Sequence, residues 1–239
     1  IEGNLAVVPA GGEDGAIIAL DKKTGEPPWK CAAGTPGYAT PYPFTYKDTR
    51  YIFCFGAKAG IIANAKSGKE ACQIPWETAY DVNASEPIYH DGHLFLSSGY
   101  KTGSALYKLA GEGDDLTAGE VWRKPKLFLT KFTSCVLKDG ILYGGDQNGL
   151  RCVDFKTGNE LWSDNSLRNA SVLLAHQSLI IMTEKGQIIV AKATGKAFER
   201  TAEANVLGGR CWTVPTLADG KLYLRNLQKA VCLDLKANG

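Results

Sequence analysis

The chain has 239 residues, of which 44% are hydrophobic and 22% are charged, and this composition excludes wholesale disorder. Its net charge of +2 comes from acidic and basic residues mixed along the sequence, which gives no electrostatic case for a nucleic-acid partner. No apolar stretch is long enough to span a bilayer, so no transmembrane segment is expected.

The chain begins with an incomplete structural unit, which is followed by complete ones. Residues 4–30 are expected to supply the last three strands of a four-stranded unit, and residues 212–239 the first three strands of another. The complete units are expected at residues 39–77, 84–123, 133–164 and 170–200. Because the two partial units overlap in the strands that they supply, we expect a ring that lacks residues upstream of the N-terminus.

Two recurring turns mark these units. An Asp-Gly pair between apolar runs is typical of a β-hairpin and occurs at residues 91–92, 139–140 and 219–220. A Thr-Gly or Ser-Gly turn occurs at residues 24–25, 67–68, 157–158 and 194–195, with spacings of 43, 90 and 37 residues. A period of about 40–45 residues with four short strands predicts an all-β fold, a single β-propeller domain of four-stranded antiparallel blades. About five to six blades are visible, as part of a ring of about seven or eight.

The Thr-Gly turns belong to a longer motif, A-x-D-x-x-T-G-x-x-x-W. Its positions are Asp21, Thr24, Gly25 and Trp29 in the first copy, and Asp154, Thr157, Gly158 and Trp162 in the second. In this tryptophan-docking motif the chain resembles the PQQ-like repeat family of quinoprotein-type β-propellers, including the propeller lipoprotein of the outer-membrane β-barrel assembly machinery. The segments PWETAYDVNASEPI and LFLSSGYKTGSAL are similar to planctomycete-type PQQ-like proteins. Asp and Thr can bond local backbone groups while Trp packs on the next blade, so the motif predicts docking between blades.

The resemblance implies a bacterial protein that is periplasmic or otherwise exported, although the signal segment is not in this chain. Quinoprotein dehydrogenases of this superfamily resemble one another in a vicinal Cys-Cys disulfide, calcium ligands and a base aspartate, and no adjacent cysteines occur here. We therefore expect a non-enzymatic scaffold that binds a protein or a polysaccharide, without cofactor, metal or catalytic residue. The alternative is an alcohol or sugar dehydrogenase dependent on pyrroloquinoline quinone (PQQ) and calcium, with part of its site upstream. Any membrane tether would belong to the missing N-terminal region.

A ligand site is expected where loops lead into the innermost strands, because several blades converge there. The candidate ligand-binding residues in these loops are Tyr38, Tyr80, Asn83, Lys131, Asn169, Arg210 and Trp212. Their aromatic, amide and cationic groups suit a polar or anionic ligand. The same groups can instead satisfy buried backbone ends and fill the channel, which is the more general use of such residues. Both interpretations stay open at the level of sequence.

Three further features favour structural interpretations. The seven cysteines contain no C-x-x-C pair and are expected to be buried free thiols. His90 and His93 flank a hairpin turn and are expected to be exposed there and not to bind a metal. The insertion GEGDDLTAGE, residues 111–120, lacks the spacing of a calcium loop and is expected to be a solvated acidic loop.

Overall fold

The structure, a computed structural model, describes residues 1–13, 16–32 and 34–235. Residues 14 and 15 of the first expected unit and residues 236–239 of the last lie outside the described residues. The described residues form six antiparallel sheets, numbered 1 to 6 in chain order, and their one helical element is the short 3-10 turn η1 (Ala79–Asp81). The all-β prediction is therefore confirmed. The chain divides into two compact units, residues 1–127 (unit 1) and 128–239 (unit 2).

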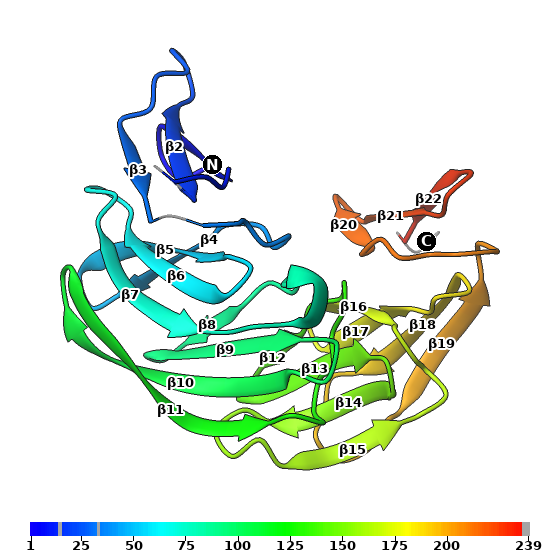
Figure 1. The fold of residues 1–239 in the computed structure, drawn as a ribbon. Helices are drawn as coiled ribbons and strands as arrows, with labels where there is room; N and C mark the ends of the chain where they lie inside the picture. Colours follow the sequence, from blue (N-terminus) through cyan, green and yellow to red (C-terminus); the bar gives the residue numbers. More distant parts are fainter. Residues whose placement is uncertain (14–15, 33, 236–239) are drawn as a thin grey trace. The chain divides into compact units, whose positions relative to one another are not determined.

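Unit 1 contains sheets 1 to 3, whose strands follow one another in chain order (Figure 1). Sheet 1 consists of β1 (Leu5–Pro9), β2 (Ile17–Asp21) and β3 (Trp29–Cys31). Sheet 2 consists of β4 (Tyr42–Tyr46), β5 (Thr49–Phe55), β6 (Ala59–Asn64) and β7 (Glu70–Pro75). Sheet 3 consists of β8 (Ile88–His90), β9 (His93–Ser98), β10 (Gly103–Glu112) and β11 (Asp115–Lys124). Because each strand pairs with its neighbour in sequence, short turns are enough to connect a sheet.

Unit 2 repeats this arrangement in sheets 4 to 6 (Figure 1). Sheet 4 consists of β12 (Val136–Lys138), β13 (Ile141–Asp146), β14 (Gly149–Asp154) and β15 (Glu160–Asp164). Sheet 5 consists of β16 (Ser171–Ala175), β17 (Ser178–Met182), β18 (Gln187–Lys192) and β19 (Arg200–Asn205). Sheet 6 consists of β20 (Thr216–Ala218), β21 (Lys221–Arg225) and β22 (Ala230–Asp234).

The three Asp-Gly pairs all connect the first two strands of a sheet. The φ angles are 47° and 71° at Asp91-Gly92, 49° and 76° at Asp139-Gly140, and 51° and 74° at Asp219-Gly220. Positive φ at both central residues is the signature of the type I′ turn, whose twist matches that of the paired strands. The predicted hairpins are therefore confirmed at these three places.

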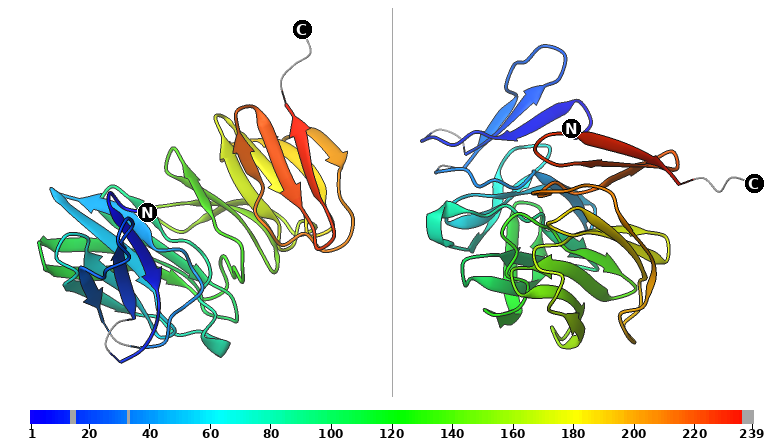
Figure 2. Two further views of the ribbon diagram at one scale, coloured as in Figure 1. Left: turned by 90° about the horizontal axis from the view of Figure 1, so that it is seen from above. Right: turned by 90° about the vertical axis from the view of Figure 1, so that its right-hand side faces the viewer.

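The hydrophobic core lies between neighbouring sheets. In unit 1, Trp29 of sheet 1 shares a buried cluster with Ile61 of sheet 2. In unit 2, Leu150 of sheet 4 shares a buried cluster with Leu179 of sheet 5. Figure 2 shows sheet 6, orange to red, beside sheet 5, yellow, and buried residues of these two sheets form a further cluster. Within each unit, neighbouring sheets therefore bury apolar surface against one another, as in other repeat proteins.

The acidic insertion is part of a long β-hairpin, so the expectation of a loop at residues 111–120 is wrong, whereas most of these residues are exposed to solvent as expected. Strands β10 and β11 are each ten residues long, and their hairpin tip lies against sheet 2. Tyr51 Oη donates a hydrogen bond to Gly113 O at 2.8 Å, and Asn64 Nδ2 donates to Asp114 Oδ1 at 2.8 Å. The charged residues at the tip therefore make tertiary contacts that their composition alone does not indicate.

All seven cysteines are free thiols. Five of them are buried, Cys72 is partly buried and Cys232 is exposed. Loss of solvent raises the pKa of Cys31 to about 11, and raises the pKa of both Cys54 and Cys152 to about 12. Because the thiolate is the reactive form, the buried thiols should be chemically inert near neutral pH.

We expect iodoacetamide to label Cys232 first in the native protein, with Cys54 and Cys152 reacting at least about 100-fold more slowly at a pH of about 8. Peptide mass spectrometry over a time course measures each rate. In concentrated urea all seven cysteines should react at similar rates, which is the control for intrinsic reactivity. Labelling of Cys54 as fast as that of Cys232 would show that the core between sheets 1 and 2 is open.

Candidate functional site

Each complete sheet has two edges with different connections. Because consecutive strands are antiparallel, the segments that link one sheet to the next lie at the same edge as the turn between the second and third strands. We name this the linker edge, and the opposite edge, with the Asp-Gly and Thr-Gly turns, the turn edge. All the candidate ligand-binding residues lie on linkers between sheets: Tyr38, Tyr80, Asn83, Lys131, Asn169, Arg210 and Trp212.

Asn83 is buried within unit 1, and the protein itself uses its side chain. Its Nδ2 donates to Gly56 O at 2.9 Å and to Ala57 O at 3.2 Å, and its Oδ1 accepts a hydrogen bond from Ser98 Oγ at 2.9 Å. Its backbone carbonyl also accepts a hydrogen bond from Tyr38 N at 2.8 Å. Because both hydrogens of the Asn83 side-chain amide are used in hydrogen bonds within the protein, this geometry favours a role in holding the linkers in place over a role in ligand contact.

The two candidate tyrosines of unit 1 are solvent-exposed. Tyr38 is 71% exposed and Tyr80 is 81% exposed. The Tyr80 ring meets Tyr100 edge to face, with the ring centroids 5.5 Å apart. Exposed aromatic rings on well-anchored loops suit a binding surface, because they offer a large contact area at a low cost in conformational entropy.

In unit 2, Glu184 brings two of the candidate residues together. Its Oε1 accepts a hydrogen bond from Trp212 Nε1 at 2.6 Å, and its Oε2 accepts one from Asn169 Nδ2 at 3.3 Å. The Trp212 ring stacks on Phe132 at 4.6 Å between centroids, and the Arg210 guanidinium lies 4.6 Å from the Trp212 ring centroid. Linkers that precede sheets 4, 5 and 6 therefore meet around one carboxylate.

The remaining candidate, Lys131, lies partly buried beside Phe132 in sequence. Glu184 was not predicted from the sequence, because it does not lie on a loop that leads into an innermost strand. Glu184 lies in the turn between β17 and β18, and strand alternation places that turn at the same edge as those loops. The expected order of the strands is enough to predict that the turn between the second and third strands of each unit lies beside the linkers, and Glu184 lies in such a turn.

A buried carboxylate supports the same edge of sheet 4. The Asp146 side chain is fully buried and accepts hydrogen bonds from Gly149 N at 3.0 Å and from Arg151 Nε at 3.1 Å. Its backbone carbonyl oxygen accepts a hydrogen bond from the backbone nitrogen of Asn169, with an N–O distance of 2.7 Å. Burial lowers the pKa of Arg151, but the carboxylates of Asp146 and Glu160 outweigh it and raise that pKa overall. The linker that carries Asn169 is therefore anchored on a charged, hydrogen-bonded turn.

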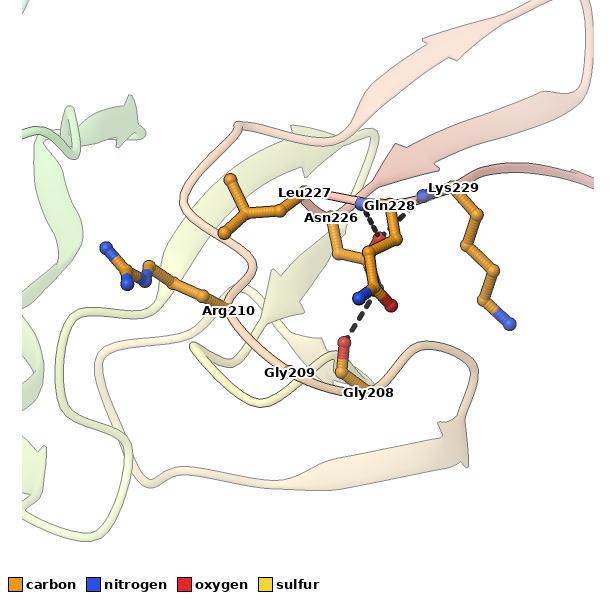
Figure 3. A pocket seen from close by; sticks show the side chains of 7 residues that line it. All are labelled: Gly208, Gly209, Arg210, Asn226, Leu227, Gln228 and Lys229. Atoms are coloured by element: carbon orange, nitrogen blue, oxygen red, sulfur yellow. Dashed lines mark hydrogen bonds between the residues drawn. The ribbon is translucent and has the colours of Figure 1, made fainter.

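Two cavities of about 480 Å³ open at this edge of unit 2. The first lies between the linker and the β21–β22 turn, where Asn226 Nδ2 donates to Gly208 O at 2.7 Å (Figure 3). Figure 3 shows Arg210 and Leu227 pointing to one side of this cavity and Lys229 to the other. The residues that line the second cavity are Ser166, Leu167, Arg168, Thr183, Glu184, Lys185, Gln187, Arg200 and Asn205. Arg200 is paired with Asp164 and Glu203, so Arg168 and Lys185 are the cations that remain beside Glu184, which favours an acidic ligand.

At the turn edge, each tryptophan of the motif contacts the next sheet. Trp29 Nε1 donates to Ala65 O at 3.2 Å, and its ring covers Gly68, where an added Cβ would lie 2.5 Å from Trp29 Cγ. Trp162 Nε1 donates to Thr194 O at 2.8 Å. These contacts support the interpretation that the motif docks one blade on the next.

The other motif residues form the turns themselves. Asp21 Oδ1 accepts hydrogen bonds from Lys23 N at 2.8 Å and Thr24 N at 2.9 Å, while Gly25 has a φ of 77°. These bonds also lower the pKa of the exposed Asp21 carboxyl. Asp154, Thr157 and Gly158 repeat the arrangement, with Thr157 N 2.8 Å from Asp154 Oδ1. The side-chain bonds hold the turn in the conformation that presents the tryptophan.

The described residues contain no cluster of the side chains that most often bind metals. Nowhere in the described ranges do three histidine, cysteine, aspartate or glutamate side chains gather as a metal site would require. His93 Nδ1 lies 2.7 Å from Asp91 O, within its own turn. The PQQ alternative stays a prediction, which a measurement of cofactor binding would test.

Residues 1–164 match the family model described as outer membrane protein assembly factor BamB. The chain belongs to this family. The predicted resemblance to PQQ-like repeat propellers is thereby confirmed. At the family level the match supports a scaffold-type propeller. No protein among those with curated descriptions matches the chain.

Several solved structures are similar to this member of the BamB family. BamB from Moraxella catarrhalis is 15% identical, with a TM-score of 0.70 over 97% of this chain and 67% of that protein. AztD from Citrobacter koseri is 12% identical, with a TM-score of 0.61 over 99% of this chain and 67% of that protein. Hsv2 from Kluyveromyces lactis is 10% identical, with a TM-score of 0.62 over 93% of this chain and 74% of that protein. At such identities the likeness shows the fold, and the predicted β-propeller is confirmed.

Proposed function

We propose that this BamB-family chain is a protein-binding scaffold that takes part in assembly at the cell envelope, outside the cytoplasm. The family match over residues 1–164 carries this proposal, because the description of that family names an outer membrane protein assembly factor. No helix in the described part of the chain has the length and apolar character to cross a membrane. A scaffold of this kind works through exposed surfaces and needs no catalytic residue.

The linker edge of unit 2 is the surface that best suits a protein partner. Trp212 is 44% exposed, and its ring is fixed by stacking on Phe132 and by the hydrogen bond to Glu184. A rigid, half-exposed tryptophan is a typical anchor of protein interfaces. Arg168 and Lys185 line the same cavity as Glu184, and neither makes a hydrogen bond or ion pair with any described side chain. The partner segment that fits this surface combines an apolar side chain with neighbouring carboxylates.

Replacing Trp212 with a photo-crosslinking phenylalanine analogue tests this proposal in the envelope of the source organism. We expect ultraviolet light to link position 212 to a component of the outer-membrane assembly machinery, identified by mass spectrometry. The same analogue at His176, which is exposed in the β16–β17 turn at the opposite edge of sheet 5, is the matched control and should give no such product.

Two results would contradict the proposal. The first is an identical set of crosslinked products from positions 212 and 176. The second is stoichiometric binding of PQQ with calcium, accompanied by reduction of a dye acceptor in the presence of an alcohol or sugar, which would establish the dehydrogenase alternative.

A further inference from the structure

The linker between sheets 2 and 3 has an unusual backbone. Tyr80 and Asp81 have φ angles of 65° and 58°, and the facing β9–β10 turn has φ angles of 54° at Tyr100 and 71° at Lys101. Residues with a side chain rarely adopt this left-handed conformation, and a bulky aromatic residue is the least suited to it. Such strained positions persist only where the surrounding structure imposes them, and they gather at functional sites.

The strained backbone displays one aromatic ring. Tyr80 meets Tyr100 edge to face at 5.5 Å and 69°, so the Tyr80 ring is held in place. It is nevertheless 81% exposed, which is the second highest exposure among the large hydrophobic residues that are exposed in the described structure. A fixed and exposed aromatic face is suited to flat apolar surfaces such as the C–H face of a sugar ring.

A cleft with apolar and polar lining groups opens at Asp81, the residue that follows Tyr80 in the chain. It has a volume of about 330 Å³ and is lined in part by Thr35, Lys58, Gln73 and Asp81. The Asp81 carboxylate and the Lys58 ammonium make no hydrogen bond or ion pair with any described side chain. Gln73 Nε2 donates a hydrogen bond to Glu70 Oε2 at 3.1 Å. The side-chain oxygen of Gln73 can then accept a hydrogen bond from another donor. The cleft thus combines a carboxylate acceptor, an ammonium donor, an amide and a hydroxyl group.

The geometry points to a binding site for a neutral oligosaccharide on the linker edge of unit 1. Hydroxyl groups both donate and accept hydrogen bonds, so they match the mixed donors and acceptors of the cleft. The opposite charges of Lys58 and Asp81 give the cleft no net attraction for a charged ligand. Its volume falls within the range of about 300–1,000 Å³ that is typical of small-ligand pockets, and is small compared with a protein interface. This site is separate from the proposed protein-binding surface of unit 2.

Isothermal titration of the full chain with cellohexaose and with N-acetylchitohexaose tests the proposal. We expect at least one probe to bind with a Kd below about 1 mM, and Tyr80→Ala and Asp81→Asn each to weaken binding at least about 10-fold. Tyr223→Ala removes a tyrosine that is 45% exposed in sheet 6 and is the matched control, with unchanged affinity. Because Tyr80 is so exposed, its loss should leave the urea unfolding transition unchanged.

Three outcomes would overturn the proposal. Neither probe binds at a concentration of about 10 mM, or Tyr80→Ala binds as tightly as the unaltered chain. The third is that Tyr80→Ala abolishes a protein crosslink and leaves oligosaccharide binding intact, which would make this surface a protein site. Failure here leaves the crosslinking at Trp212 untouched, so the two proposals fail separately.

Discussion

Replacing Trp29 with alanine is expected to lower the free energy of unfolding of unit 1 by about 3–5 kcal/mol. The side chain is 8% exposed, its ring covers Gly68 of the next sheet, and its Nε1 donates to Ala65 O. The substitution removes this packing and leaves a cavity between sheets 1 and 2. It also removes the hydrogen-bond donor of the Ala65 carbonyl oxygen. Urea unfolding followed by circular dichroism measures the change, with the m-value compared between variants.

Tyr38→Ala is the control, because this side chain is 71% exposed and its loss should change stability by no more than about 0.5 kcal/mol. If the two units unfold separately, the loss caused by Trp29→Ala should appear in the transition of unit 1 alone. A loss below about 1 kcal/mol would contradict the docking role of the tryptophan.

Gly145→Ala is expected to destabilise unit 2 by about 1–3 kcal/mol or more, and to abolish partner crosslinking from position 212. A Cβ at this position would lie 2.0 Å from Ala170 O and 2.8 Å from Ala170 N. These are backbone atoms, so relief requires the linker to move away from β13. That movement would carry Asn169 away from Glu184 and disturb the linker surface that surrounds position 212.

Gly119→Ala is the matched substitution in a strand. Its added Cβ would find no atom closer than Lys108 O at 3.9 Å, so we expect unfolding and crosslinking to remain as in the unaltered chain. Unfolding and crosslinking are measured on the same preparations. Retention of both properties in Gly145→Ala would show that the linker is not seated against β13 as described.

The sequence predicted the elements that depend on local chemistry. Asp91-Gly92 and the two equivalent pairs predicted hairpins, because only a few residue types tolerate positive φ at both turn positions. The motif around Asp21 predicted a turn that its own side chains stabilise. It did not name the acceptors of the tryptophans, Ala65 O and Thr194 O, because those atoms belong to the next sheet. The spacing of the turns was enough for the propeller fold.

Features that depend on tertiary contacts could not be predicted in the same way. The charges at residues 111–120 indicated a solvated loop. The hydrogen bond between Asp114 and Asn64 of another sheet could not be predicted, because it does not depend on the residues near Asp114 in sequence. Strand β19 is exposed along its whole length, so it lacks the alternation of apolar and polar residues that marks a strand. Glu184 is one acidic residue in a turn, and only the meeting of three linkers gives it a role.

The long β10–β11 hairpin has a consequence for how neighbouring blades dock. At the Ser67-Gly68 turn, which is a degenerate copy of the motif, Asn64, Ser67 and Gly68 keep the turn, but Cys72 stands where the copies at Asp21 and Asp154 have tryptophan. The hairpin tip covers this turn from sheet 3, with Asp114 bound to Asn64 and 3.5 Å from Lys69 Nζ. The hairpin tip thus supplies, at this turn, a contact between neighbouring sheets that the tryptophan supplies in the copies at Asp21 and Asp154. A lengthened strand pair in the following blade can therefore take over the docking of one blade on the next where the motif has no tryptophan.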